Sequence, residues 1–390
     1  MTTYTLYELQ QKRPLSNLGF DPFPWYKQKR MTDPVSIDEQ EELCEVFRYK
    51  DVHAVLSDPL LFSSKGIFGG EEEGAERGSI IVIDPPRHKK LRTLVSQAFT
   101  PRTIARQADK IRGIVNQLLD ASTTSGVLDV IRDLALPLPI LVIVEMLGVP
   151  LARQADFKRW TQAAFSHSQE QGASGFRACE NYMRELIMQR RKVRQDDLIS
   201  ALLDARVDGE PLTEQEIVDF CAALLGGGFE TTEHLIGNIL LCLDEYPSAR
   251  AQLWADPSLV SNTLEEVMRF RPVVHRLVRT ATKDTEIGGI QVKAGYRMFA
   301  WTASAGRDEE RWSDPDVFDI QRSSSQHFNF GAGIHFCLGA PLARLEAKIV
   351  LEQIIERFAD IQRVREVPLQ LFENFSLYGV QQLPMRVQKR

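Results

Sequence analysis

The spacing of hydrophobic and polar positions predicts helix along most of the chain. The longest periodic segment covers residues 212–243, and Thr213 with Glu216 forms a capping-box pattern at its start. At a rise of ~1.5 Å per residue, about 30 helical residues would extend roughly 45 Å. We therefore expect this helix to cross a whole domain.

Two further helices are predicted in the C-terminal half. One covers residues 256–270, with Asp256 as the N-cap and Pro257 at the first helical position. The other covers residues 338–358 and is the last helix of the chain. Between them, residues 285–305 contain strand-like runs in which glycine pairs mark turns. The pattern as a whole predicts a mainly α protein with a minor β-sheet.

The most apolar stretch runs from Leu134 to Pro150. Pro137, Pro139 and Glu145 interrupt it, and it is too short to span a bilayer, so a buried helix is expected. The N-terminal segment has no apolar core of signal-peptide type. We therefore expect a soluble protein without a membrane segment.

Composition and charge narrow the class of protein further. The chain has 390 residues and a net charge of −6, with 43% hydrophobic and 26% charged residues. This length can bury a substantial core, and no boundary divides it, so residues 1–390 are predicted to form a single domain. The negative charge argues against nucleic-acid binding.

The five cysteines are scattered without a CxxC pair, which argues against a disulfide framework, a zinc site or an iron–sulfur site. A reducing environment fits this pattern, so we expect a cytoplasmic location.

Two segments rich in glycine or small polar residues predict loops. Glycine and charge cluster in residues 66–78, which is typical of a surface loop. Residues 166–175 are small and polar, and we expect them to join two helices.

The segment FGAGIHFCLG, residues 330–339, places Cys337 among glycines, aromatic residues and a histidine. Ordering glycine is costly in chain entropy, so the segment predicts that something approaches the backbone closely. Gly331 and Gly333 permit backbone angles closed to other residues, and Gly339 would let a flat group lie against the following helix. The free N–H groups at that helix N-terminus would stabilise a thiolate, the form of cysteine that binds metal.

The spacing F-G-x-G-x-H-x-C-x-G resembles the haem-binding loop of cytochromes P450 at every defined position. The resemblance implies the cytochrome P450 fold, with haem between the long central helix and the helix that follows the cysteine. It also implies haem b, iron protoporphyrin IX, as the cofactor and Cys337 as the thiolate ligand of its iron. A porphyrin would then be the group that approaches the glycine-rich backbone.

Other segments are similar to the same family over nearly the whole chain. Glu266 and Arg269 match the family's E-x-x-R, which implies a buried ion pair that fixes the cysteine loop. The alternative is a surface pair worth well under ~1 kcal/mol. His327 also fits the family, and we expect it to be structural. Basic residues stand at the family's propionate-binding positions, where plain solvation is the alternative: His88, Arg92, Arg279 and His335.

The sequence GGGFETT interrupts the long helix at residues 226–232. Each glycine in a helix interior costs roughly 1 kcal/mol relative to alanine, so the segment indicates close helix packing, a groove, or both. It resembles the oxygen-activating segment of the family. That resemblance implies that Thr231 donates a hydrogen bond to dioxygen and that Glu230 relays protons through water. Gly227 stands where alanine is commoner in the family, which would widen the pocket.

The resemblance also indicates where substrate would bind. The expected segments are mostly apolar or small, which suits a small hydrophobic organic substrate. His275 and Arg276 are exceptions; Arg276 is expected to face outward or pair structurally rather than to bind a substrate carboxylate. The expected contact segments are residues 64–80, residues 165–176, the long helix near Ala223, residues 273–277 and residues 374–380.

The sequence contains no flavin, nicotinamide or iron–sulfur motif, so electrons would come from a separate partner. The resemblance implies a ferredoxin or flavodoxin with its reductase. A basic surface on the cysteine side of the haem would attract such an acidic carrier. The candidate residues of that surface are Arg102, Arg106, Lys110 and Arg344.

These observations together predict a haem-thiolate monooxygenase. It would activate dioxygen with two externally supplied electrons and insert one oxygen atom into a hydrophobic organic substrate. Three alternatives stay open: a peroxide-driven enzyme, an enzyme that couples or rearranges substrates without oxygen insertion, and a haem-binding sensor without turnover. The Glu230 and Thr231 pair argues against the first and the last.

Overall fold

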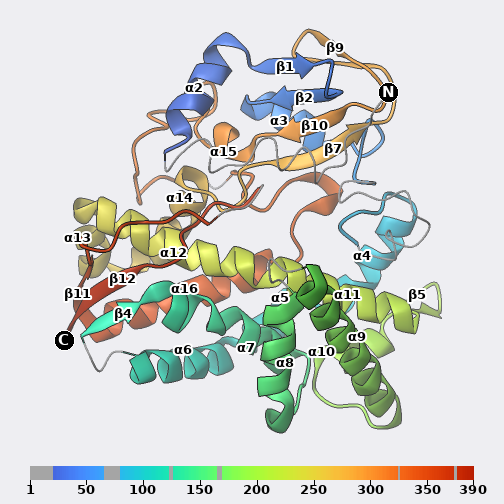
Figure 1. Cartoon of the computed structure of the whole chain (residues 1–390), viewed down its shortest axis with the longest axis vertical. Helices are drawn as coiled ribbons and strands as arrows, with labels where there is room; N and C mark the ends of the chain where they lie inside the picture. The colour runs from blue at the N-terminus through green and yellow to red at the C-terminus, as the bar shows by residue number, and fades with distance from the viewer. Residues whose placement is uncertain (1–20, 66–79, 123–125, 165–168, 324–325, 373–375) are drawn as a thin grey trace.

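The computed structural model describes residues 21–65, 80–122, 126–164, 169–323, 326–372 and 376–390. Helices dominate this part of the chain, and most of the strands gather in a sheet region beside them (Figure 1). The prediction of a mainly α protein with a minor β-sheet is confirmed. The predicted loop at residues 66–78 lies outside the described residues.

A five-stranded sheet forms the upper part of Figure 1, in the order β1-β2-β10-β7-β3. β10 runs parallel to β2, and the other neighbouring pairs are antiparallel. The strands of this sheet are β1 (Val35–Asp38), β2 (Leu43–Val46), β3 (Phe62–Ser63), β7 (Leu277–Ala281) and β10 (Arg297–Ala300).

The predicted strand runs at residues 285–305 form three strands and a short helix. β8 (Thr285–Ile287) and β9 (Ile290–Val292) pair antiparallel. Gly288 and Gly289 between them have φ angles of +57° and +84°, where other residues are strained, so the predicted glycine turn is confirmed. The segment then continues through β10 into α15 (Thr302–Ala305), and its end is therefore helical.

The apolar stretch at residues 134–150 forms α7 (Pro137–Met146), which follows the π-helical segment η2 (Val130–Ala135). Pro137 lies in the first turn of α7, where a missing N–H leaves no hydrogen bond unmade. Nearly all of α7 is buried in the core, as predicted. In the described part of the chain, no helix is long and apolar enough to cross a membrane.

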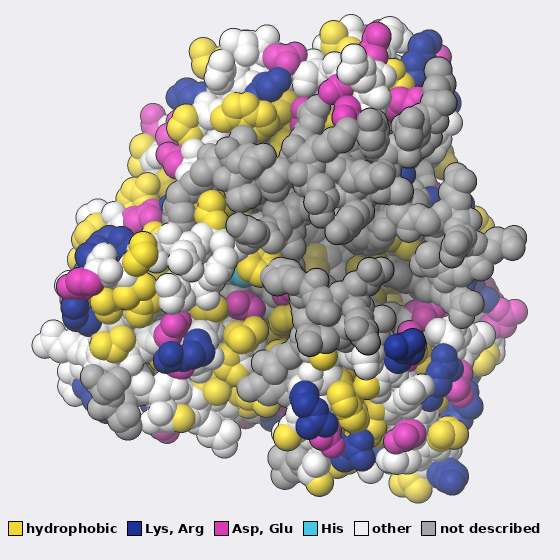
Figure 2. Space-filling model, viewed as in Figure 1, with side chains coloured by type: hydrophobic (Ala, Val, Ile, Leu, Met, Phe, Trp, Pro, Cys, Tyr) yellow, Lys and Arg dark blue, Asp and Glu magenta, His cyan; other side chains and the backbone are white. Residues whose placement is uncertain are grey.

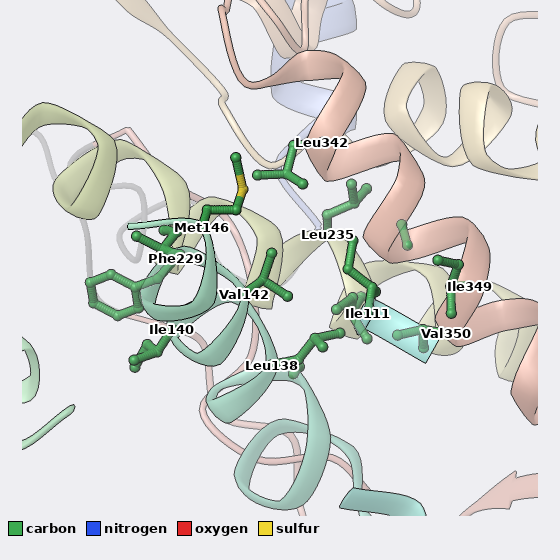
Figure 3. Packing of buried hydrophobic residues seen from close by; sticks show 14 of the residues in the cluster. Ile111, Leu138, Ile140, Val142, Met146, Phe229, Leu235, Leu342, Ile349 and Val350 are labelled. Carbon is green, nitrogen blue, oxygen red and sulfur yellow. The ribbon is translucent and has the colours of Figure 1, made fainter. Parts of the chain in front are cut away.

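The predicted long helix consists of two helices, α11 (Glu214–Gly228) and α12 (Glu230–Glu245). The capping box is present: the Thr213 hydroxyl accepts from the Glu216 N–H, and the Glu216 carboxylate accepts from the Thr213 N–H. Phe229 stands at the break and lies beside α7 in the core (Figure 3). The glycine-rich interruption therefore divides the helix.

Almost the whole of α12 is buried, and it forms the centre of the core. Figure 3 shows Leu235 of α12 in the same hydrophobic cluster as Val142 of α7 and Leu342 of α16 (Ala340–Arg357). Burying hydrophobic side chains of this size contributes about 1.5–3 kcal/mol each. This packing holds α12, which carries the predicted oxygen-activating residues, against the helix that follows Cys337.

The predicted helix start at Asp256 is confirmed: Asp256 accepts from the Ser258 N–H, and Pro257 lies in the first turn of the 3₁₀ segment η3 (Pro257–Leu259), which leads directly into α14 (Val260–Phe270). The prediction of a loop at residues 166–175 is wrong from residue 169 onward. The expected loop at residues 166–175 is described from residue 169 onward, and there it is part of α9 (Gln169–Lys192). The weak helix propensity of its small residues is overridden by packing of α9 on α8 (Leu151–Ala164).

The other elements surround this core. β11, β12 and β4 form a three-stranded antiparallel sheet. On the face shown in Figure 2, basic and acidic side chains are interspersed. The remaining elements are α2 (Phe23–Thr32), α3 (Tyr49–Ser57), α4 (Arg87–Ala98), α5 (Pro101–Ala105), α6 (Ala108–Ser122), β4 (Val127–Asp129), α10 (Leu198–Asp204), β5 (Arg206–Val207), β6 (Glu210–Pro211), α13 (Pro247–Ala255), η4 (Gly333–His335), β11 (Phe358–Arg363) and β12 (Pro384–Lys389).

Candidate active site

Cys337 lies between η4 and α16, at the end of the glycine-rich loop. Its N–H donates to the Phe330 carbonyl at 2.9 Å, which closes the loop. Burial raises the pKa of the Cys337 thiol, and the N–H groups of Gly339 and Ala340 together with Arg92 oppose that shift without overcoming it. The predicted thiolate is therefore not favoured by the protein alone. A bound metal ion would produce it, because coordination removes the thiol proton.

The loop glycines have different roles. Gly331 and Gly333 have φ angles of +70° and +67°, as predicted. A Cβ on Gly333 would lie 2.5 Å from the Leu56 carbonyl oxygen, so this glycine admits the end of α3 rather than a ligand. A Cβ on Gly339 would meet only the Cys337 sulfur within 4 Å, at 3.8 Å. Space for a flat group therefore lies beside Gly339.

The structure brings together the basic residues that were predicted to bind the haem propionates. The rings of His88 on α4 and His335 on η4 lie with their centroids 4.4 Å apart. Arg92, one turn after His88, donates to the Phe336 carbonyl at 2.7 Å. Burial, with Arg279 of β7 and His88 adding to it, lowers the pKa of His335 to about 3. The elements α4, β7 and η4 thus bring positively charged or proton-accepting side chains close together.

Some of these groups are buried without a partner. The Nε2 atoms of His88 and His335 are buried and make no hydrogen bond, and Arg279 is only 5% exposed. The charge of Asp84 acts on all three residues, but this carboxylate already accepts from the Ser64 N–H at 3.1 Å. Because buried polar groups are normally satisfied, the cluster fits an anionic ligand such as a porphyrin carboxylate.

The break between α11 and α12 combines tight packing with open space. A Cβ on Gly228 would lie 2.9 Å from the Ile143 side chain, whereas a Cβ on Gly227 would have nothing within 4 Å. The Thr231 hydroxyl donates to the Gly227 carbonyl at 2.7 Å, and the Thr232 hydroxyl donates to the Gly228 carbonyl at 2.9 Å. The prediction of close packing is therefore confirmed for Gly228, and the groove at Gly227 stays a prediction.

The hydrogen bond of Thr231 changes its predicted role. A hydroxyl has one proton to donate and two lone pairs that accept. Because the Thr231 proton is engaged by the Gly227 carbonyl, this side chain presents an acceptor, where the sequence predicted a donor. An acceptor at this position can hold a water molecule, and the water can donate in its place.

Sequence reasoning missed two ionisable residues in α12. Burial, reinforced by the charge of Glu230, raises the pKa of Glu233 to about 8. Burial lowers the pKa of His234 to about 4, and neither of its ring nitrogens has a hydrogen-bond partner. Both side chains are thus neutral at neutral pH. The signal was present in the sequence, since these two polar residues directly precede the apolar run that starts at Leu235.

The ion pair predicted from E-x-x-R is buried, with Glu266 2% exposed and Arg269 0% exposed. It holds residues 306–322, which precede the cysteine loop, and not the loop itself. Arg269 donates to the carbonyls of Gly306, Pro315 and Val317, and Glu266 accepts from the N–H of Asp319 and from Arg322.

A second ion-pair cluster fixes the start of the cysteine loop. Arg344 of α16 donates to both carboxylate oxygens of Glu265 at 2.6 and 3.0 Å, and its guanidinium lies over the Phe330 ring at 4.5 Å. His327 Nε2 lies 3.2 Å from the same carboxylate, in the structural role predicted for it. Burial alone would raise the pKa of Glu265, but hydrogen bonds from His327 and Arg344 lower it to about 2.

This cluster bears on the predicted basic surface. Arg344 is engaged by Glu265, and Lys110 lies 2.7 Å from a Glu145 carboxylate oxygen. Arg102 and Arg106, on α5 and directly after it, are exposed. The sequence analysis did not distinguish these four basic residues. In the structure, acidic neighbours partly neutralise Arg344 and Lys110.

His275 and Arg276 belong to the core of the sheet region. The Arg276 guanidinium lies 4.8 Å from the ring centroids of both Phe299 and Trp301, and the residue is 1% exposed. His275 Nδ1 and the Tyr26 hydroxyl are 2.8 Å apart. These contacts support a structural role for Arg276 rather than binding of a substrate carboxylate. Of the predicted substrate segments, three extend into residues outside the described ranges, namely 64–80, 165–176 and 374–380.

Comparison with known proteins gives one consistent result. The family model "Cytochrome P450" matches residues 139–384. "Cytochrome P450 109" of Bacillus spizizenii is 38% identical over 378 residues, which cover 94% of this chain and 92% of that protein. "Cyclomarin C epoxidase CymV" of Salinispora arenicola is 37% identical over 372 residues, or 92% of this chain and 94% of that protein. The crystal structure of CYP109E1 from Bacillus megaterium in complex with corticosterone has a TM-score of 0.89 at 38% identity, covering 94% of this chain and 98% of that chain.

Proposed function

The chain belongs to the cytochrome P450 family and is a haem-dependent monooxygenase, and from this premise we propose that Cys337 is the residue that binds the haem iron. The space beside Gly339 next to the Cys337 sulfur is the observation that carries this assignment. Haem held by a thiolate supplies the activation of dioxygen, because the thiolate pushes electron density that favours O–O cleavage.

The basic cluster would hold the two carboxylates of haem b. His88 and His335 have buried nitrogens without partners, and Arg92 and Arg279 supply permanent positive charge beside them. Charge-assisted hydrogen bonds to carboxylates are about twice as strong as neutral ones. The same contacts would hold the haem edge to α4, β7 and η4.

Thr231 and Glu230 would deliver protons. Thr231 offers an acceptor lone pair at the groove beside Gly227, where it would position a water molecule. Glu230 precedes it at the start of α12 and would supply the proton that this water passes on. Their positions at a break in the helix support this proposal, because the break leaves room for water.

The proposal extends to substrate and electrons. A small hydrophobic organic substrate would enter the groove beside Gly227, and one oxygen atom of dioxygen would be inserted into it. One solved relative is in complex with corticosterone, and one curated relative is named "Cyclomarin C epoxidase CymV", which supports an organic substrate. Two electrons per turnover would come from a separate ferredoxin or flavodoxin with its reductase, docking near Arg102 and Arg106. The protein would act in the cytoplasm, with residues 1–390 as one domain.

Reconstitution of the holoenzyme tests this function. The protein is supplied with a ferredoxin, its reductase and isotope-labelled dioxygen, and hydrophobic compounds that shift the haem absorption band serve as substrates. We expect products that carry one labelled oxygen atom. Product formed only with added peroxide would favour the peroxide-driven enzyme. Rearranged or coupled product without labelled oxygen would favour an enzyme that couples or rearranges its substrate. Binding without any product would favour the haem-binding sensor.

A further inference from the structure

Glu233 is a buried carboxyl group in α12 that the proposed function leaves without a task. It lies one helical turn after Glu230, and the residue as a whole is 9% exposed. Residues three apart on a helix are neighbours on its surface, with about 5–6 Å between their Cβ atoms. The two side chains therefore start from neighbouring positions in the first turn of α12, close enough for the charge of Glu230 to act on Glu233.

The chemistry of Glu233 differs from that of a structural acid. Glu266 is buried in an ion pair with Arg269, and the partly exposed Glu265 pairs with Arg344, whereas among the described residues the charge that shifts the pKa of Glu233 is the like charge of Glu230. Burial is the larger cause, and the pKa of about 8 leaves Glu233 protonated at neutral pH. His234, the next residue, stays neutral over the same range because burial lowers its pKa to about 4.

The order of the side chains around α12 forms a path. Successive residues turn by about 100° around a helix axis, so Thr231 lies about 100° from Glu230 on one side. Glu233 lies about 60° from Glu230 on the other side, by the same geometry. Glu230 therefore stands between the threonine at the groove and the protonated acid on the far flank of the helix.

We propose that Glu233 is a second proton-carrying residue of this enzyme, which acts through Glu230. The Glu233 carboxylic acid transfers its proton to the Glu230 carboxylate, and Glu230 passes that proton on toward the groove. Glu233 is left as a carboxylate and takes a new proton from water. Each cycle moves one proton from solvent to Glu230 and consumes nothing else. The inference rests on the proposed role of Glu230.

Glu346 provides a matched control elsewhere in the fold. It is another buried glutamate, 1% exposed on α16, and burial raises its pKa to about 8 as well. It does not lie in the row formed by Thr231, Glu230 and Glu233. Glu233→Gln and Glu346→Gln therefore each remove one protonated carboxyl group of similar character, and only the first removes a member of the proposed path.

Infrared spectroscopy of the holoenzyme tests the protonation state without turnover. A carboxylic acid has a carbonyl stretch distinct from that of a carboxylate, and the band shifts when its proton is exchanged for deuterium. We expect one such band to disappear in Glu233→Gln and another in Glu346→Gln. If Glu233→Gln does not fold, the band that survives in Glu346→Gln is followed alone. Absence of a Glu233 band at neutral pH overturns the proposal.

Steady-state kinetics test the path itself. We expect Glu233→Gln to lower kcat by roughly tenfold with KM unchanged, to increase the solvent deuterium isotope effect, and to lose the fall in kcat near pH 8. Glu233→Asp should recover part of the rate, and Glu346→Gln should leave it unchanged. If Glu233→Gln has a normal kcat while Glu230→Gln has a lowered kcat, the role of Glu233 is overturned and the role of Glu230 stands. Normal kcat in both variants overturns the proposed role of Glu230 as well.

Discussion

The guanidinium of Arg269 and the carboxylate of Glu266 meet inside the protein through two hydrogen bonds of 2.7 and 2.8 Å. Neither side chain reaches solvent to a useful extent, with 0% and 1% of their side-chain surfaces exposed. Arg269 completes its shell with backbone carbonyls of residues 306–317, so one buried charge organises a segment that has little regular structure. Breaking the pair would leave the other charge buried without compensation.

Glu266→Ala is accordingly expected to lower the free energy of unfolding by about 3–5 kcal/mol. Denaturant unfolding measures this loss, and haem content after purification reports whether the segment before the cysteine loop still holds its shape. Lys293 and Asp284 form a matched exposed pair at 2.8 Å, with 66% and 61% of their side chains accessible. Lys293→Ala should leave the free energy of unfolding nearly unchanged, because an exposed pair is screened by solvent. Equal effects of the two substitutions would contradict the buried role.

Cys337→His should abolish thiolate ligation of the iron. Wild-type protein, reduced under carbon monoxide, is expected to show the far red-shifted absorption band of a thiolate-bound haem. The variant should bind carbon monoxide without that band. Cys242→Ala, at a buried cysteine in α12, should retain it. A shifted band that persists in Cys337→His would show that another residue is the ligand.

Thr231→Ala should separate reductant consumption from product formation. Alanine is a good helix former, so haem binding and substrate affinity are expected to stay normal while the acceptor at the groove is lost. The ratio of product formed to reductant consumed should fall by roughly tenfold, with hydrogen peroxide released instead.

Thr232 serves as the control for Thr231, because its hydroxyl makes the same kind of bond one residue further on, to Gly228. Thr232→Ala should leave the ratio unchanged, and Thr231→Ser should restore it. A fully coupled Thr231→Ala protein would mean that this hydroxyl only satisfies the Gly227 carbonyl.

Arg276→Leu is expected to destabilise the sheet region without altering ligand recognition. Its guanidinium lies over Phe299 and Trp301 in a buried setting, where such a contact contributes about 2 kcal/mol. Thermal unfolding should shift to lower temperature, and the affinity for an acidic hydrophobic ligand, measured by the haem band shift, should stay within about twofold. A tenfold loss of that affinity would instead support a carboxylate site.

The stability of the protein should depend on pH through Glu233. Its pKa is about 8 in the folded state against an ordinary 4.5, so the folded state keeps a proton that the unfolded state releases. The contribution of Glu233 is fully present below about pH 4.5 and is lost as the pH rises to about 8. At 1.36 kcal/mol per unit, the loss relative to Glu233→Gln approaches roughly 4 kcal/mol. Urea unfolding of both proteins across this range measures it, and a constant difference would contradict the shifted pKa.

Several features were determined by the sequence because their causes are local. The capping box depends on Thr213 and on a residue three positions later, and Gly331 and Gly333 are required where φ is positive. The spacing around Cys337 likewise places the sulfur at a helix start within a few residues. Motifs of this kind are readable because each residue acts on its own neighbours in the chain.

Other features were decided by tertiary structure, because they depend on which distant segments meet. The helical state of residues 169–175 depends on the packing of α9 against α8. The Arg276 guanidinium lies among aromatic rings of the sheet region that come from a distant part of the chain. Glu233 is the clearest example. Its protonation state depends on how far the rest of the fold removes it from water, and the spacing of residues along one helix does not predict that burial.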